Sequence, residues 1–95
     1  MQDELILIML KQDLEILHSN NEDYLIQLIG TAKGMIAREG ITLGEDYEDQ
    51  ALVVMYAAWR YRKRASTDST MPRMLRASLN NKLVSQKMEV TEDDG

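Results

Sequence analysis

The clearest pattern of apolar positions lies between residues 22 and 39. Apolar residues stand there at positions i, i+3, i+4, i+7 and i+11, namely Leu25, Leu28, Ile29, Ala32 and Ile36. This spacing places them along one face of an α-helix. Asn20 or Asn21 can cap its start, with Glu22 and Asp23 in the first turn. Gly40 follows Arg38 of the last turn, in the position where glycine commonly ends a helix.

The first segment is apolar in every direction. Asp3 can cap a helix from about Glu4 to Asp13, but Leu5 to Leu10 are all apolar. A helix of that kind is buried on more than one side. A small domain cannot easily surround its first helix, so we expect a protein partner there. A buried strand over Leu5 to Leu10 is the competing interpretation, because a short apolar run has no decisive period.

Two more helices follow an acidic loop. Asp46 suits the N-cap of a third helix, with Asp49 three residues later as in a capping box. Its predicted apolar face contains Ala51, Val54, Met55 and Ala58, widened by Leu52, Tyr56 and Trp59, and the helix ends near Arg64. The polar run 66–70 predicts a mobile loop. Pro72 fits the first turn of a fourth helix with Leu75, Leu79 and Leu83 on one face.

These elements predict an all-α fold. The chain has 95 residues, with five Gly, one Pro and no Cys, which argues against a many-stranded sandwich and against disulfides. We expect one four-helix domain over residues 1–88, with the middle two helices as a central antiparallel pair. Residues 89–95 are predicted to form a disordered acidic tail.

Nothing in the sequence predicts secretion or a membrane span. Asp3 and Glu4 stand where a signal peptide carries basic residues. The longest apolar run, Leu5 to Leu10, is far shorter than a bilayer-spanning helix. The expected compartment is the cytoplasm, or a particle assembled there.

Charge is distributed unevenly along the chain. Residues 1–50 carry a net charge of −8, residues 51–88 carry +7, and residues 89–95 carry −4. The basic half could bind nucleic acid, or it could meet the acidic half of another copy in head-to-tail association. The two halves could also neutralise each other within one fold.

The sequence predicts neither a catalytic centre nor a metal or cofactor site. His18 is the only histidine, and we expect it to be a solvated surface residue. Gly30 and Gly34 lie within a helical pattern, so they do not form a phosphate-binding loop. The acidic cluster Glu45, Asp46, Glu48 and Asp49 lacks the spacing of a calcium loop. We therefore expect a protein that is not an enzyme.

Two groups of residues are candidates for contacts with other molecules. Gly30 and Gly34 each cost helix stability relative to Ala, and they make a flat strip for another helix, either within the monomer or from another subunit. Together with Ile6 and Met9 they form the predicted apolar subunit contact. The basic group contains Arg60, Arg62, Lys63, Arg64, Arg73 and Arg76. The helix dipole accounts for only one or two of the first four cations, and Tyr61 among them could stack on a base or on a partner's Arg.

The order of the predicted helices resembles a known family. The segments that carry the resemblance are Leu10-Lys11-Gln12-Asp13-Leu14, Asp23 to Gly40, Asp49 to Arg64 and Met71 to Leu83. They are similar to the small all-helical head–tail connector proteins of tailed bacteriophages. The resemblance covers most of the chain from Leu5 to Leu83. The apolar run before Lys11 and the acidic tail depart from the family pattern.

The resemblance implies a structural virion protein. Such connectors form a ring of identical subunits beneath the portal protein, extend the DNA channel and join a downstream tail or stopper protein. The ring needs one face of a subunit to bind a different face of the next. The basic group would then contact a neighbouring subunit, the portal, or DNA in the channel without sequence preference. The expected location is the head–tail junction of the virion, with the host cytoplasm during assembly.

Two other functions remain open from the sequence. A small helical DNA-binding regulator would place the basic third and fourth helices on DNA. The net charge of −5 and the long polar loop between those helices argue against a helix-turn-helix. A phage or plasmid protein that binds some other partner is the third possibility.

Overall fold

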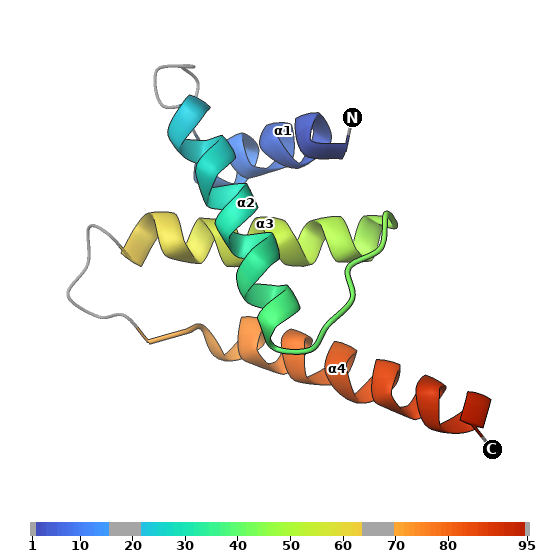
Figure 1. The fold of residues 1–95 in the computed structure, drawn as a ribbon. Helices are drawn as coiled ribbons and strands as arrows, with labels where there is room; N and C mark the ends of the chain where they lie inside the picture. Colours follow the sequence, from blue (N-terminus) through green and yellow to red (C-terminus); the bar gives the residue numbers. More distant parts are fainter. Residues whose placement is uncertain (1, 16–21, 64–69, 95) are drawn as a thin grey trace.

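The computed structural model contains four helices in the part of the chain that it describes (Figure 1). It describes the backbone of residues 2–15, 22–63 and 70–94, and the side chains of residues 4–15, 22–63 and 70–88. The helices are α1 (Gln2–Leu14), α2 (Glu22–Arg38), α3 (Tyr47–Lys63) and α4 (Arg73–Asp94). The all-α prediction is confirmed, and the alternative of a strand over Leu5 to Leu10 is wrong. The predicted caps Asn20 and Asn21, His18, and most of the 66–70 loop lie outside the described residues.

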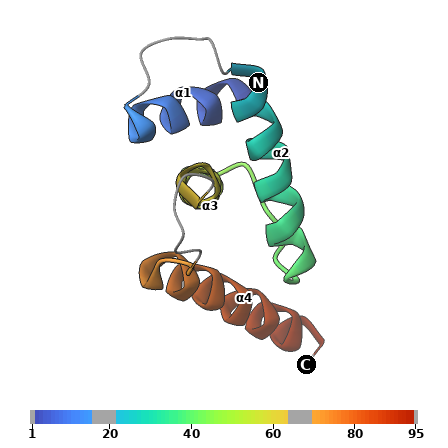
Figure 2. The same cartoon turned by 90° about the vertical axis from the view of Figure 1, so that its left-hand side faces the viewer.

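Helix α3 lies at the centre of the fold. Helices α1, α2 and α4 all pack against it. Figures 1 and 2 show α1 and α4 on opposite sides of α3, with α2 crossing it on a third side. Helix α3 alone is therefore the centre, and α1 and α4 cover it from opposite directions. The predicted antiparallel pair of middle helices is wrong, because α2 crosses α3 instead of lying alongside it (Figures 1 and 2).

The prediction for α2 is confirmed in detail. Its buried residues are the five that the spacing selected, Leu25, Leu28, Ile29, Ala32 and Ile36. Gly40 has a φ of +98°, and its N–H donates to the carbonyl of Ala37 at 3.0 Å. Glycine adopts this left-handed backbone without the cost that a Cβ brings. The turn brings Ile41 back into the core.

The prediction for α3 located the wrong centre of the buried face. Val53 and Ala57 are only 2 % and 0 % exposed, yet neither was in the predicted stripe. Ala51 and Met55, which were predicted to be core residues, are only half-buried. A helix that is covered on three sides has no single apolar face, so a periodicity argument cannot find its centre.

Helix α1 buries one face and leaves the other open. Ile6 and Leu10 are buried, whereas Leu5 and Ile8 are exposed. The single chain therefore does not surround this helix, and burial of its outer side by a partner stays a prediction. Leu5 and Ile8 remain 43 % and 53 % exposed.

Helix α4 packs through Leu75 and Leu79, which are buried, and through the partly buried Leu83. Pro72 lies just before the helix rather than within its first turn, and its carbonyl accepts the N–H of Arg76 at 3.0 Å. The backbone of α4 is helical to Asp94. Residues 89–94 of the predicted acidic tail therefore belong to this helix. Their side chains lie outside the described residues.

Candidate interaction surfaces

The acidic and basic halves of the chain pair within the fold. The guanidinium of Arg62 donates to the carboxylate and to the backbone carbonyl of Asp13, both at 3.1 Å. The guanidinium of Arg76 donates to the carboxylate of Glu39. Each pair joins a residue of the basic half to one of the acidic half. Of the three interpretations of the charge pattern, neutralisation within the molecule is the one that these contacts support.

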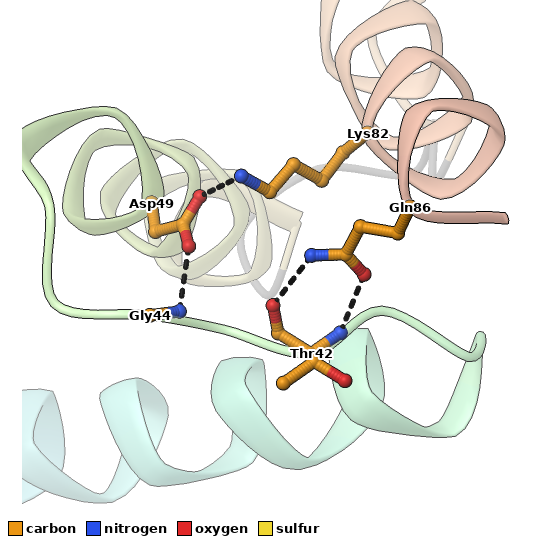
Figure 3. Close-up of polar contacts among 5 residues, drawn as sticks. All are labelled: Thr42, Gly44, Asp49, Lys82 and Gln86. Carbon is orange, nitrogen blue, oxygen red and sulfur yellow. Dashed lines mark hydrogen bonds and ion pairs between the residues drawn. The ribbon is translucent and has the colours of Figure 1, made fainter. Parts of the chain in front are cut away.

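The most buried of these pairs joins α3 to α4 (Figure 3). The ammonium of Lys82 lies 2.7 Å from Oδ1 of Asp49, whose side chain is 4 % exposed. The other carboxylate oxygen of Asp49 accepts the backbone N–H of Gly44 at 2.6 Å. The backbone partner of Asp49 is thus Gly44, two residues before the Asp46 N–H that the predicted capping box uses, and the residue also holds α4 through Lys82.

Both titrating groups of this pair have shifted pKa values. Burial alone would raise the pKa of Asp49, but the hydrogen bonds from Lys82 and Gly44 and the charge of Lys82 outweigh it, so the pKa is lowered. The hydrogen bond to Asp49 raises the pKa of Lys82 despite its partial burial. Both shifts favour the charged pair at neutral pH.

A second contact joins α4 to the loop after α2. The side-chain amide of Gln86 donates to the carbonyl of Thr42, and its oxygen accepts the N–H of Thr42, both at 2.8 Å (Figure 3). The Gln86 amide thus forms hydrogen bonds with both the backbone N–H and the backbone carbonyl of Thr42. Sequence spacing gave no signal for this contact, because the two residues are far apart in the chain.

The five described members of the predicted basic group make different contacts. Arg62 lies against Asp13 of α1, whereas Arg76 lies against Glu39 at the end of α2. The ammonium of Lys63 lies 5.1 Å from the ring centre of Trp59. The guanidinium Nε of Arg60 is buried, Arg73 is exposed, and Arg64 lies outside the described residues. Tyr61, expected to stack on a base or a partner, packs near Tyr24 with ring centres 6.2 Å apart.

The predicted apolar contact residues also separate. Ile6 is 2 % exposed and belongs to the core of this chain, so its assignment to a subunit contact is corrected: it is not available to a neighbour. Met9 is half-buried beside the core. Gly30 and Gly34 are exposed, and a Cβ added to either would have no atom within 4 Å. Close packing within the monomer therefore does not explain these glycines.

Sequence reasoning missed the outer face of α4. Met74, Val84 and Met88 are exposed there, just as Leu5 and Ile8 are exposed on α1. The spacing of the leucines in α4 identified only its buried face, and these exposed residues lie outside that spacing. Because α1 and α4 lie on opposite sides of α3 (Figures 1 and 2), the molecule carries two different exposed apolar faces.

The described residues contain no group of three or more His, Cys, Asp or Glu side chains placed to hold a metal ion. Within the same residues, none of the helices combines the length and the apolar character needed to cross a bilayer.

Comparison of the chain with protein-family models, curated proteins and solved structures gives no significant match.

Proposed function

We propose that this protein is a structural assembly protein of the head–tail connector type. It associates head to tail into a ring beneath a portal protein, extends the DNA channel and receives a tail or stopper protein. The observation that carries this proposal is the pair of unlike apolar faces on opposite sides of α3. One consists of Leu5 and Ile8 on α1, and the other of Met74, Val84 and Met88 on α4.

Two unlike faces favour head-to-tail association, which gives a ring where the rotation between subunits closes and a filament where it does not. Contact between different faces of neighbouring copies continues from one subunit to the next until the rotation closes. Leu5 with Ile8, and Val84 with Met88, are about one helical turn apart and so are neighbours on the helix surface. Larger exposed apolar patches mark sites of association. The helix order that resembles the connector family supports the same function.

The charges have a smaller role in this proposal than their sequence pattern indicated. Because Arg62, Arg76 and Lys82 pair within the chain, the subunit contact rests on the apolar faces. Arg73 is exposed, so it stays a candidate for contact with a neighbouring subunit or with DNA in the channel. Contact with DNA phosphates would be salt-dependent and independent of sequence.

The test is assembly of the full chain, alone at high concentration and with purified portal protein, followed by electron microscopy and native mass spectrometry. We expect closed rings once the portal protein is present. Ile8→Asp places a charge on the α1 face and should prevent ring formation while the circular dichroism stays helical. Gln27→Asp adds the same charge at an exposed position of α2 and should leave rings intact.

The regulator function makes the opposite prediction. A regulator binds one duplex sequence, commonly about 10³-fold or more tightly than other DNA. Selective binding of that kind at physiological salt, together with the absence of rings under every condition, would replace the connector proposal with the regulator.

A further inference from the structure

The outer face of α4 has the residue spacing of a helix–helix seam. Met74, Ala77, Asn81, Val84 and Met88 follow one another at intervals of three, four, three and four residues, and all five are exposed. We call these five residues the α4 seam. Alternating intervals of three and four are the repeat of a coiled coil, which brings one stripe of a helix against a partner helix. The leucines that hold α4 to its own domain lie on the opposite side of the helix.

The surroundings of the seam leave room for a second helix. Figure 1 shows α4 at the edge of the molecule, with its C-terminal end extending past the N-terminal end of α3. A groove runs along one side of the seam, between the first turns of α3 and the middle of α4. It is lined by Ala51, Met55, Ser78, Ser85 and other residues of these two helices. Small side chains at such a border allow a partner helix to approach closely.

The charge along α4 indicates which helix fits. Arg73 begins the helix and is exposed, and the sequence of its last turns carries Glu89, Glu92, Asp93 and Asp94. A second α4 that runs antiparallel would place each basic start beside the acidic end of its partner. A parallel arrangement would place like charges together at both ends, which is unfavourable.

We propose that two copies of this chain pair through antiparallel α4 seams. The two helices can be aligned so that each seam residue faces a seam residue of the other copy. Ala77 then lies opposite Met88 of the second copy, and Asn81 lies opposite Val84. A small residue then faces a large one, and a two-fold axis passes between residues 82 and 83 of the two helices. The contact is isologous, so each copy contributes the same surface.

This inference goes beyond the proposed ring and has a consequence for it. The paired seams cover the apolar face of α4, one of the two faces that head-to-tail association uses. A free dimer therefore cannot extend into a chain of subunits until the seams separate. That consequence, unlike the dimer itself, rests on the proposed function.

The dimer is tested with the full chain by analytical ultracentrifugation over a range of concentrations. Wild-type protein should sediment as a dimer, and Val84→Asp should weaken dimerisation by at least about tenfold, the effect of a residue central to an interface. Ile8→Asp is the matched control, because Ile8 and Val84 are 53 % and 54 % exposed. It should remain dimeric and yet lose the ring, which separates the two proposals.

A monomeric wild type at concentrations up to about 1 mM would overturn the inference, since weaker association is rarely specific. A dimer that Val84→Asp leaves intact would overturn it equally.

The orientation is tested by cross-linking, for which a chain without cysteine is well suited. Ala77→Cys protein mixed with Met88→Cys protein should form a disulfide-linked dimer on mild oxidation. Either variant alone should cross-link much more slowly. Rapid cross-linking of Ala77→Cys with itself would show a parallel pair, and no cross-linking in the mixture would show that the seams do not meet. Either result contradicts the proposal.

Discussion

At the scale of single residues, Gly30 and Gly34 test whether α2 is built for stability alone. A Cβ at either position would meet open space, and Ala is favoured over Gly within a helix. Gly30→Ala and Gly34→Ala should each raise the free energy of unfolding of the monomer by about 0.5–1 kcal/mol. Urea denaturation of the two variants measures this change.

Gly40 provides the matched control. Its φ of +98° is strained for any residue with a Cβ, and that atom would lie 3.3 Å from Cδ1 of Leu83. Gly40→Ala should therefore lower the free energy of unfolding by about 1–2 kcal/mol. A loss of stability at Gly30 or Gly34 would mean that these glycines face a neighbour that the single chain does not show.

Asp49 should give the protein an acid-sensitive contact. Its pKa is lowered in the folded state from the ordinary 3.8, so the unfolded chain binds a proton more readily than the folded chain. The stabilisation is complete well above pH 3.8 and is lost as the pH falls through that value to the pKa of the folded state. The reverse holds for Lys82, whose contribution is present below pH 10.5 and lost as the pH rises through its raised pKa.

Removal of the carboxylate should remove this pH dependence. Asp49→Asn should cost about 1.5–3 kcal/mol at pH 7, typical of a hydrogen bond to a charged group, and should flatten the stability curve below about pH 4. Glu48→Gln changes an exposed neighbour and should preserve the slope. Denaturation curves across the acid range decide, and a parallel shift of the Asp49→Asn curve at all pH values would contradict the explanation.

At the scale of elements, the sequence predicted helices better than it predicted their buried faces. Helix α2 is covered on one side, so the interval between its apolar residues identified Leu25, Ala32 and the rest of its buried face. Helix α3 is covered by three helices, and two of its most buried positions, Val53 and Ala57, were missed. The spacing of apolar residues identifies the buried face of a helix only where the opposite face is exposed to solvent. Little of the α3 surface is exposed, so the spacing of its apolar residues does not identify its centre.

The difference between the two faces of α3 can be measured directly. Ala57 is fully buried, so Ala57→Leu should overpack the centre and cost about 1–3 kcal/mol. Ala51 borders open grooves on both sides, so Ala51→Leu should change stability by less than about 0.5 kcal/mol. Equal effects in chemical denaturation would mean that α3 is rotated from the orientation described.

At the scale of the whole molecule, the sequence revealed the charge asymmetry but not whether the charges pair within the chain or with other molecules. The separation into acidic and basic halves favoured intermolecular partners as strongly as internal ones. Contacts such as Arg62 with Asp13 depend on which helices pack against each other, here α3 and α1, and local patterns do not encode this. The same limit hid the α4 seam, because its exposure becomes evident only after Leu75 and Leu79 are placed in the core.

The attachment of α4 has a consequence for the order in which the fold opens. α4 lies across α3 from α1 and is held to the domain by its inner leucines, the Lys82 contact with Asp49 and the Gln86 contact with Thr42. Such a helix can detach as a cooperative unit while α1, α2 and α3 remain folded. In native-state hydrogen exchange of dilute protein, the amides of α4 should exchange as a group before those of α2 and α3. Gln86→Ala should speed that group alone, whereas uniform acceleration along the chain would mean that the molecule opens all at once.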